Sequence, residues 1–293
     1  MSKISKLGLG IIAFENFELL PSIIYEIKDK VDYITLCLQK ESYHGQPIEE
    51  SDIKSAEQLK EYGYVDDIIW FDITNKHLDD QYDNGPRLIE TDKRNFILDH
   101  LEKEIGCSHC MVIDSDEFYN GVDFERAKEI INNDDSIKVT YCQYVNYFRD
   151  YQHLLVWPFP SYVPFITESH YRFDFYKGIL NQPADPTRKY FIPETDGKFT
   201  LFAWQAVKMH HLSWIRLKIE KKILNWSSRS KFNHADSLDK YTLDRYYNYK
   251  DGQNMILMFN TPENQVCVNK LPMQYIHPKF KITDKLIPYS DIK

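Results

Sequence analysis

The chain lacks any apolar run near the roughly 20 residues that a helix needs to cross a bilayer. The apolar N-terminal segment from Leu7 to Phe14 is too short for a helical anchor, and no small-residue cleavage site follows it. We therefore expect neither a signal peptide nor a transmembrane segment, and we expect a soluble, cytoplasmic protein.

Cysteine is scarce and odd in number. The five cysteines are Cys37, Cys107, Cys110, Cys142 and Cys267. An odd count, mostly within apolar segments, fits free thiols in a reducing compartment. Cys107 and Cys110 have C-x-x-C spacing, but no second pair completes a metal knuckle, and a strand rather than a helix is predicted after them. We interpret the pair as structural.

The chain also has no excess of positive charge. It contains 36 Lys and Arg and 44 Asp and Glu, which gives a formal net charge of -8. Binding to a nucleic-acid backbone requires a basic face, so this balance disfavours a nucleic-acid partner without excluding a local basic groove. Aromatic residues, by contrast, make up 15% of the chain. They indicate either an aromatic-rich core or platforms on which sugars or bases stack.

Apolar, β-branched segments alternate with segments whose apolar residues recur at helical spacing. The predicted elements, in chain order, are strand 7–14, helix 21–30, strand 31–38, helix 51–62, strand 65–71, helix 87–105, strand 109–113, helix 124–132 and strand 137–148. This α/β pattern predicts a mostly parallel sheet flanked by helices. The length suits one large domain at 1–225, with an irregular C-terminal extension at 226–293 packed on it.

The second half of the chain is less regular. Prolines predict loops at 156–164 and 181–188, whereas apolar residues predict a strand at 200–207 and a helix at 217–226. The last sixty or so residues are polar and rich in tyrosine, with little periodicity.

Segments that contain polar residues lie at the carboxyl ends of three of the predicted strands. They are Phe14-Glu15-Asn16, Asp72 and Asp114-Ser115-Asp116. Ligands of open α/β sheets bind beyond the carboxyl ends of the strands, so we expect these three segments to meet at one edge of the sheet.

Asp114 and Asp116 lie two residues apart after an apolar strand, and Glu117 adds a third carboxylate. Adjacent carboxylates repel each other unless a cation neutralises them, and Mg²⁺ and Mn²⁺ prefer oxygen ligands. The alternative is an ordinary acidic turn. The alternating pattern around the motif favours a metal site.

In order and spacing, these segments resemble the GT-A (Rossmann-like) fold of nucleotide-sugar glycosyltransferases, close to the family-2-like group. The resemblance covers roughly residues 7 to 150. It rests on the first strand end, on Lys93-Arg94-Asn95 in the preceding helix, and on the Asp-x-Asp motif. A later segment, Met209-His210-His211, matches the late histidine that many such enzymes use as a further metal ligand.

The resemblance implies roles for these residues. Phe14, Glu15 and Asn16 would hold the nucleotide base, Asp72 the base or ribose, and Lys93 or Arg94 the diphosphate. Asp116 would bind the metal directly, while Asp114, with Ser115 beside it, would contact the ribose or the metal shell. Adjacent histidines on an extended strand point to opposite faces, so only one of His210 and His211 should reach the metal, and His211 is favoured. An imidazole ligand favours Mn²⁺ over Mg²⁺.

The implied activity is metal-dependent transfer of a sugar from a UDP- or GDP-linked donor to a hydroxyl acceptor, either a carbohydrate or another molecule. Glu194 and Asp196 are the candidate general bases if the reaction inverts the anomeric centre, and inversion and retention both stay open. Trp157, Tyr162 and Phe165 could line the acceptor side or simply anchor loops.

Three other functions remain open. A nucleotidyltransferase acting on a sugar phosphate would share the sheet, the metal and the nucleotide, but it favours a Gly-rich basic first loop, and Phe14 to Glu18 is acidic and lacks glycine. A non-catalytic carbohydrate-binding module with this fold would not need the acidic pair with a late histidine. A DNA-modifying sugar transferase is disfavoured by the negative charge.

Overall fold

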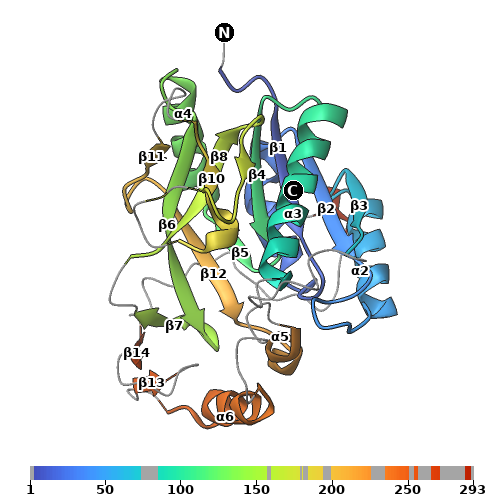
Figure 1. The fold of residues 1–293 in the computed structure, drawn as a ribbon, viewed down its shortest axis with the longest axis vertical. Coiled ribbons are helices and arrows are strands. Elements are labelled where there is room, and N and C mark those ends of the chain that lie inside the picture. The colour runs from blue at the N-terminus through green and yellow to red at the C-terminus, as the bar shows by residue number, and fades with distance from the viewer. Residues whose placement is uncertain are drawn as a thin grey trace.

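The protein folds as an α/β structure in which a curled, mixed sheet is flanked by helices (Figure 1). The computed structural model describes residues 3–73, 85–156, 160–178, 180, 184–193, 199–225, 235–250, 254–256, 265–270 and 288–291. The α/β, Rossmann-like class predicted from the alternating pattern is confirmed.

Four parallel strands form the N-terminal half of the sheet, in the order β3-β2-β1-β4. They are β1 (Leu7–Ile12), β2 (Tyr33–Gln39), β3 (Asp67–Phe71) and β4 (His109–Asp114). The chain moves outward from β1 to β3 and then returns to the other side of β1. This reversal creates a topological switch point between the carboxyl ends of β1 and β4, where Ile12 pairs with Asp114.

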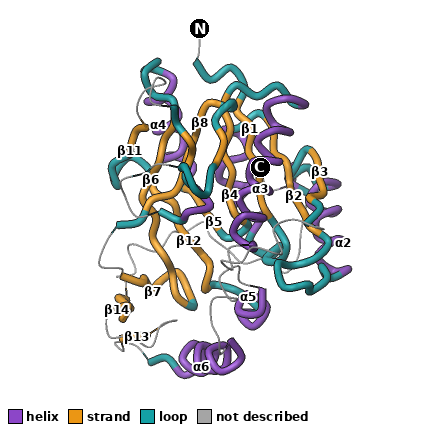
Figure 2. The backbone as a smooth tube through the Cα atoms, viewed as in Figure 1, coloured by secondary structure: helices purple, strands orange, loops and turns teal. Residues whose placement is uncertain are grey.

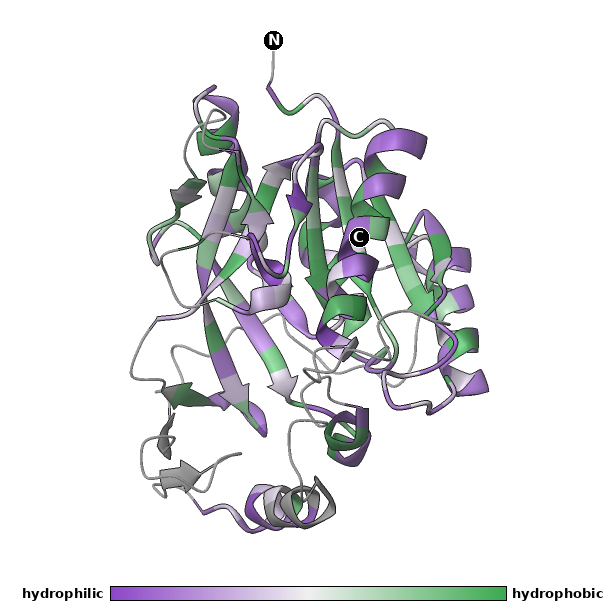
Figure 3. Cartoon of the chain, in the orientation of Figure 1, coloured by the Kyte–Doolittle hydropathy of each residue, from purple (hydrophilic) through white to green (hydrophobic). Residues whose placement is uncertain are grey.

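Helices cover both faces of this half (Figure 2). They are α1 (Leu20–Ile27) with the 3₁₀ turn η1 (Lys28–Lys30), α2 (Glu50–Glu61), α3 (Gly85–Asp99) with the π turn η2 (His100–Glu104), and α4 (Gly121–Asn132). Buried residues of α1, α2 and α4 form one core cluster, while α3 and η2 belong to a second. The central strands are mainly hydrophobic, as buried parallel strands are (Figure 3).

Strand β1 shows how the sequence sets these two layers. Leu9 and Ile11 point into the first core cluster, and Gly8 and Gly10 alternate with them toward α3. A Cβ atom at Gly10 would collide with the Cγ2 atom of Ile97, so glycine is what lets α3 approach the sheet.

Gly10→Ala is therefore expected to lower the free energy of unfolding by about 1–3 kcal/mol, the usual cost of overpacking a core. Urea denaturation measures this directly. Val122→Ala is the control, because Val122 is 66% exposed and its truncation should leave stability nearly unchanged. Equal midpoints for wild type and Gly10→Ala would contradict the account of β1.

The second half of the sheet is largely antiparallel. Its strands are β5 (Glu117–Tyr119), β6 (Val139–Phe148), β7 (Asp150–Val156), β8 (Tyr162–Glu168), β11 (Phe199–Leu201), β12 (Lys208–Trp214), β13 (Asn254–Ile256) and β14 (Gln265–Lys270). Strand β8 pairs antiparallel with both β4 and β6, and β12 runs parallel to β6. A separate two-stranded sheet pairs β9 (Arg172–Phe173) with β10 (Tyr190–Phe191).

Two predictions for this half were wrong. The proline-rich segment predicted as a loop at 156–164 ends in strand β8, which tolerates Pro164 because the pairing register shifts beside it. The strand predicted at 200–207 is instead the short β11, followed by a turn before β12 begins at Lys208.

The C-terminal part adds α5 (Ile219–Asn225), α6 (Ala235–Asn248) and the 3₁₀ turn η8 (Tyr289–Asp291), while an earlier 3₁₀ turn, η3 (Pro186–Arg188), precedes β10. Helix α6, which the sequence did not predict, contributes Tyr246 to a third core cluster that also contains Ile219 and Ile223 of α5. Strand β14 pairs with β7, so residues of the predicted extension 226–293 extend the sheet. Among the described residues, no helix is both long and apolar enough to cross a membrane.

His109, at the start of β4, gives a pH-dependent prediction. Burial lowers its pKa to about 4. The unfolded chain takes up this proton below about pH 6.5 whereas the folded protein does not, so stability should fall between pH 6.5 and about 4, by a total of about 3 kcal/mol. Urea unfolding across this range should give a flatter profile for His109→Gln than for the wild type. Parallel profiles would contradict the assignment.

Candidate active site

A cavity of about 220 Å³ opens at the carboxyl ends of β1, β2 and β4, at the topological switch point. Its lining residues are Ile12, Phe14, Glu15, Gln39, Ser42, Tyr43, Glu90, Lys93, Asp114, Ser115, Asp116, Asp185, Arg188, His211, Arg216, Lys222 and Asn225. Seven residues predicted from the sequence therefore meet there: Phe14, Glu15, Lys93, Asp114, Ser115, Asp116 and His211.

Asp114, the last residue of β4, lies between two arginines. Arg94 of α3 donates from Nη2 to both carboxylate oxygens, at 2.9 and 3.1 Å, and Arg188 of η3 donates to Oδ2. Arg188 also donates to buried Glu117, so it bridges two carboxylates of the motif. Burial opposes ionisation of Asp114, but Arg188 and Arg94 outweigh it and hold its pKa below the usual value.

Asp116 has a different set of partners. Arg216 donates from Nη2 to Oδ2 at 2.7 Å, and Lys222 Nζ lies 3.8 Å from the same oxygen. His211 Nε2 lies 3.5 Å from Oδ1. Burial raises the pKa of the Asp116 carboxyl, yet His211, Lys222 and Arg216 together hold it well below its usual range. Burial also lowers the pKa of Lys222, to about 8, with Arg216 adding to the effect.

The two adjacent histidines of β12 point to opposite faces of the strand, as extended backbone requires. His211 faces the cavity, and its Nδ1 lies 2.6 Å from Oδ1 of Asn146. An amide oxygen only accepts, so Nδ1 is the donor of this hydrogen bond, and Nε2, on the other side of the ring, faces Asp116. His210 packs instead against Tyr147 and Phe118, with Nδ1 2.8 Å from the Tyr147 hydroxyl.

The loop after β1 closes one side of the cavity. Glu15 accepts from Arg216 Nη1 at 2.7 Å, and its backbone carbonyl accepts from the Ser115 hydroxyl at 3.1 Å. Asn16 has a positive φ of 71° and is buried behind this rim, outside the cavity lining. The loop therefore connects the acidic motif to Arg216 of the second half.

The end of β2 supplies residues that the sequence reasoning missed. Lys93 Nζ donates to Gln39 Oε1 at 2.5 Å and lies 5.0 Å from the centroid of the Tyr43 ring. Burial lowers the pKa of Lys93. The rule that strand ends carry the site could have identified Gln39, which ends β2. No sequence signal marked Tyr43, Arg188 or Lys222.

Other predicted residues lie elsewhere. Asp72 follows the edge strand β3, is exposed, and does not line the cavity, so the expected convergence of three strand ends holds for two of them only. Arg94 reaches the site through Asp114. Phe165 is fully buried in the core, because its strand lies in the middle of the sheet, and so it cannot stack on an acceptor. Glu194, Asp196 and Trp157 lie outside the described residues.

The side chains around Asp116 suit a divalent cation that a substrate shares. Among the described residues, no three His, Cys, Asp or Glu side chains converge closely enough to hold an ion by themselves. Asp116 and His211 could supply two ligand atoms, and Mg²⁺-like sites commonly complete their shell with substrate phosphates and water. The hydrogen bond between His211 Nδ1 and Asn146 is of the kind that orients histidines in metal sites.

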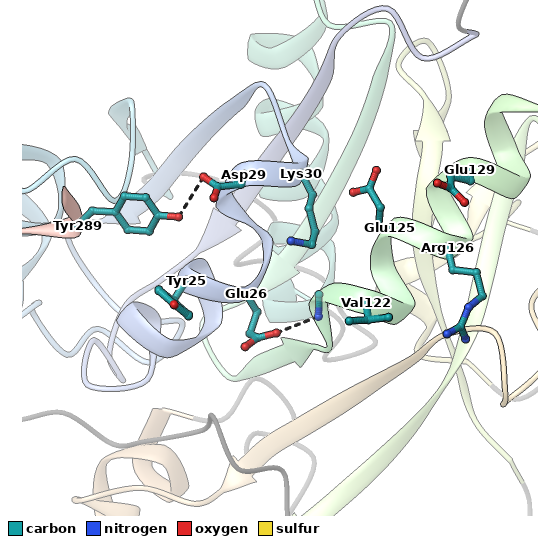
Figure 4. Close-up of a pocket in the computed structure, with 10 residues that line it drawn as sticks. Tyr25, Glu26, Asp29, Lys30, Val122, Glu125, Arg126, Glu129 and Tyr289 are labelled. Atoms are coloured by element: carbon teal, nitrogen blue, oxygen red, sulfur yellow. Dashed lines mark hydrogen bonds between the residues drawn. The ribbon is translucent and has the colours of Figure 1, made fainter. Parts of the chain in front are cut away.

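A larger concavity, of about 570 Å³, lies between α1 and α4 (Figure 4). Tyr289 of η8 borders it and donates to Asp29 at 3.2 Å, while Glu26 accepts from the Gly121 amide at 3.0 Å. None of the predicted site residues lines this larger concavity. The smaller cavity at the strand ends is therefore the candidate active site.

Comparisons with known proteins give little further identification. No family model and no curated protein matches the chain. Solved structures do match, and one is a protein of Bacillus anthracis assigned as a glucose-1-phosphate thymidylyltransferase, solved with sucrose. The two chains are 12% identical, the match covers 82% of this chain and 83% of the other, and the TM-score is 0.31. A similarity of this size identifies neither a family nor an activity.

Proposed function

We propose that the protein is a metal-dependent glycosyltransferase that uses a nucleoside diphosphate sugar. The observation that carries the proposal is the pairing of Asp116 with His211 at the switch-point cavity, beside Arg216 and Lys222. Two ligand atoms for a cation and two positive charges beside them match a diphosphate, which binds both a divalent cation and cationic side chains.

In this proposal, Asp116 and His211 hold Mn²⁺ or Mg²⁺, with Mn²⁺ favoured by the imidazole. When bound, the cation stabilises the negative charge of the leaving diphosphate. Asp114 is held in place by Arg94 and Arg188, and its Oδ1, which accepts from Arg94 alone of these two, accepts a hydrogen bond from a ribose hydroxyl. Ser115 fixes the loop of Glu15 against the motif through its bond to the Glu15 carbonyl.

The end of β2 is the proposed place for the base of a UDP- or GDP-linked donor. Tyr43 offers an aromatic ring, and Gln39, Ser42 and Lys93 offer polar atoms along the same wall of the cavity. Phe14, from the loop after β1, faces the cavity as well. These residues would fix the orientation of the base while the phosphates reach Asp116.

The acceptor is a hydroxyl compound, and it must lose a proton during transfer. Glu194 and Asp196 remain the predicted bases. Asp185 lines the cavity ahead of them in the same stretch of chain, and its Oδ1 accepts from the Thr187 amide at 2.8 Å. We therefore add Asp185 as a third candidate for the base.

The test compares two reactions with purified protein and Mn²⁺. In one, a panel of UDP- and GDP-sugars is assayed for release of the nucleoside diphosphate. In the other, nucleoside triphosphates with sugar 1-phosphates are assayed for release of pyrophosphate, the reaction of a nucleotidyltransferase. The proposal predicts metal-dependent diphosphate release. Pyrophosphate release alone would replace it with the nucleotidyltransferase, and binding of sugars without either reaction would favour a carbohydrate-binding module.

A further inference from the structure

Two cationic side chains lie beside the same carboxylate oxygen of Asp116, the proposed metal ligand. Arg216, after β12, donates to Asp116 Oδ2 at 2.7 Å, and Lys222, on α5, lies 3.8 Å from that atom. The other oxygen, Oδ1, faces His211. The negative charge of Asp116 is therefore neutralised at Oδ2 by Arg216 and Lys222, while Oδ1 faces Nε2 of His211, the second proposed metal-binding atom.

A divalent cation bound between Oδ1 and His211 Nε2 would lie next to both positive charges. The side chains of Asp116, Arg216 and Lys222 are largely removed from water, so the repulsion between the cation and the two positive side chains is weakly screened. The free protein should consequently bind the cation weakly. A diphosphate relieves the repulsion, because its oxygens accept hydrogen bonds from ammonium and guanidinium groups.

We propose that Lys222 neutralises Asp116 in place of the cation in the free protein and turns to the diphosphate when cation and donor bind. Arg216 stays fixed by Asp116, Glu15 and the Ser213 carbonyl. This inference rests on the proposed function. It makes the binding of metal and nucleotide mutually favourable, since each removes the obstacle to the other, and such a coupling is reciprocal by thermodynamic necessity.

The position of helix α5 allows Lys222 to exchange Asp116 for a phosphate. Ile219 and Ile223 anchor α5 in the third core cluster, so the helix backbone is held while its polar side faces the cavity. Among the described residues, Lys222 Nζ has an ion-pair partner in Asp116 but makes no hydrogen bond. Its movement toward a phosphate would therefore break one ion pair and no hydrogen bond.

Lys221 on the same helix provides a matched control. It pairs with Glu49 at 2.6 Å and with Asp52 at 3.6 Å, and it does not line the cavity. Lys221→Gln and Lys222→Gln thus remove the same charge from adjacent positions, with only the second at Asp116.

The experiment measures free Mn²⁺ by electron paramagnetic resonance during titrations with and without UDP. For Lys222→Gln, we expect binding of Mn²⁺ alone to tighten and binding of UDP with Mn²⁺ to weaken, so that the coupling between them falls by about 5-fold or more. Lys221→Gln should behave as the wild type. Melting temperatures verify that both variants are folded.

Two results would overturn the inference. If Lys222→Gln binds Mn²⁺ alone no more tightly than the wild type, Lys222 does not compete with the cation, although Mn²⁺-dependent UDP binding by the wild type would still support the proposed function. If the wild type binds no Mn²⁺ even with UDP present, the proposed function fails and the inference fails with it.

Discussion

Asp116→Asn is expected to lower kcat/KM for the sugar nucleotide by about 10²-fold or more. Asparagine keeps the shape of the side chain but removes the negative charge that the cation and the two cationic side chains require. The loss of one well-placed electrostatic group in an active site costs this much in other enzymes. Steady-state release of the nucleoside diphosphate in the presence of Mn²⁺ measures the effect.

The matched control for this variant is Asp123→Asn. Asp123 lies in the first turn of α4 and forms a surface ion pair with Arg126 at 3.3 Å. It should retain full activity, and both variants should melt as single folded species. If Asp116→Asn kept wild-type activity, and kept it in excess chelator, the metal site would be refuted.

Arg188→Met is expected to lower the free energy of unfolding by about 3–5 kcal/mol, the usual cost of removing one partner from a buried ion pair. The Arg188 side chain is only 9% exposed and bridges Asp114 and Glu117, of which Glu117 is 1% exposed. Methionine fills much of the same space but leaves both carboxylates with less compensation. Urea denaturation at neutral pH measures the loss.

Arg126→Met is the comparison for that measurement. The Arg126 side chain is 51% exposed, and surface ion pairs contribute about 0–1 kcal/mol. Its unfolding midpoint should lie close to that of the wild type. If Arg188→Met were as stable as Arg126→Met, Arg188 would not be a structural support of the motif, and its position over the cavity would need another explanation.

The sequence was informative where local periodicity decides position. Strand-end placement identified Glu15, Asp114 and Asp116, because the carboxyl ends of neighbouring parallel strands share one edge of the sheet. Alternation along an extended strand predicted that only one of His210 and His211 would face the site, because successive side chains point to opposite faces. Both rules need only a few consecutive residues.

The rest depends on contacts between distant parts of the chain. Arg188 lies 74 positions from Asp114, and Arg216 lies 201 positions from Glu15, so no local pattern links them. Asp72 was expected at the site, but its strand is at the sheet edge, away from the switch point. Strand β8 was missed because Pro164 and the prolines before it indicated a loop, and helix α6 was missed because its many polar residues obscure the apolar pattern on which prediction relies.

The central claim is that Asp116 and His211 hold one cation that also contacts the donor diphosphate. Pulsed electron paramagnetic resonance of Mn²⁺ in the ternary complex with UDP tests it most directly, because it detects nuclei bound close to the ion. The account predicts both a histidine nitrogen coupling and a phosphorus coupling in the wild type, with loss of the nitrogen coupling in His211→Gln. A phosphorus coupling that persists with no nitrogen coupling, or a nitrogen coupling unchanged in His211→Gln, would contradict it.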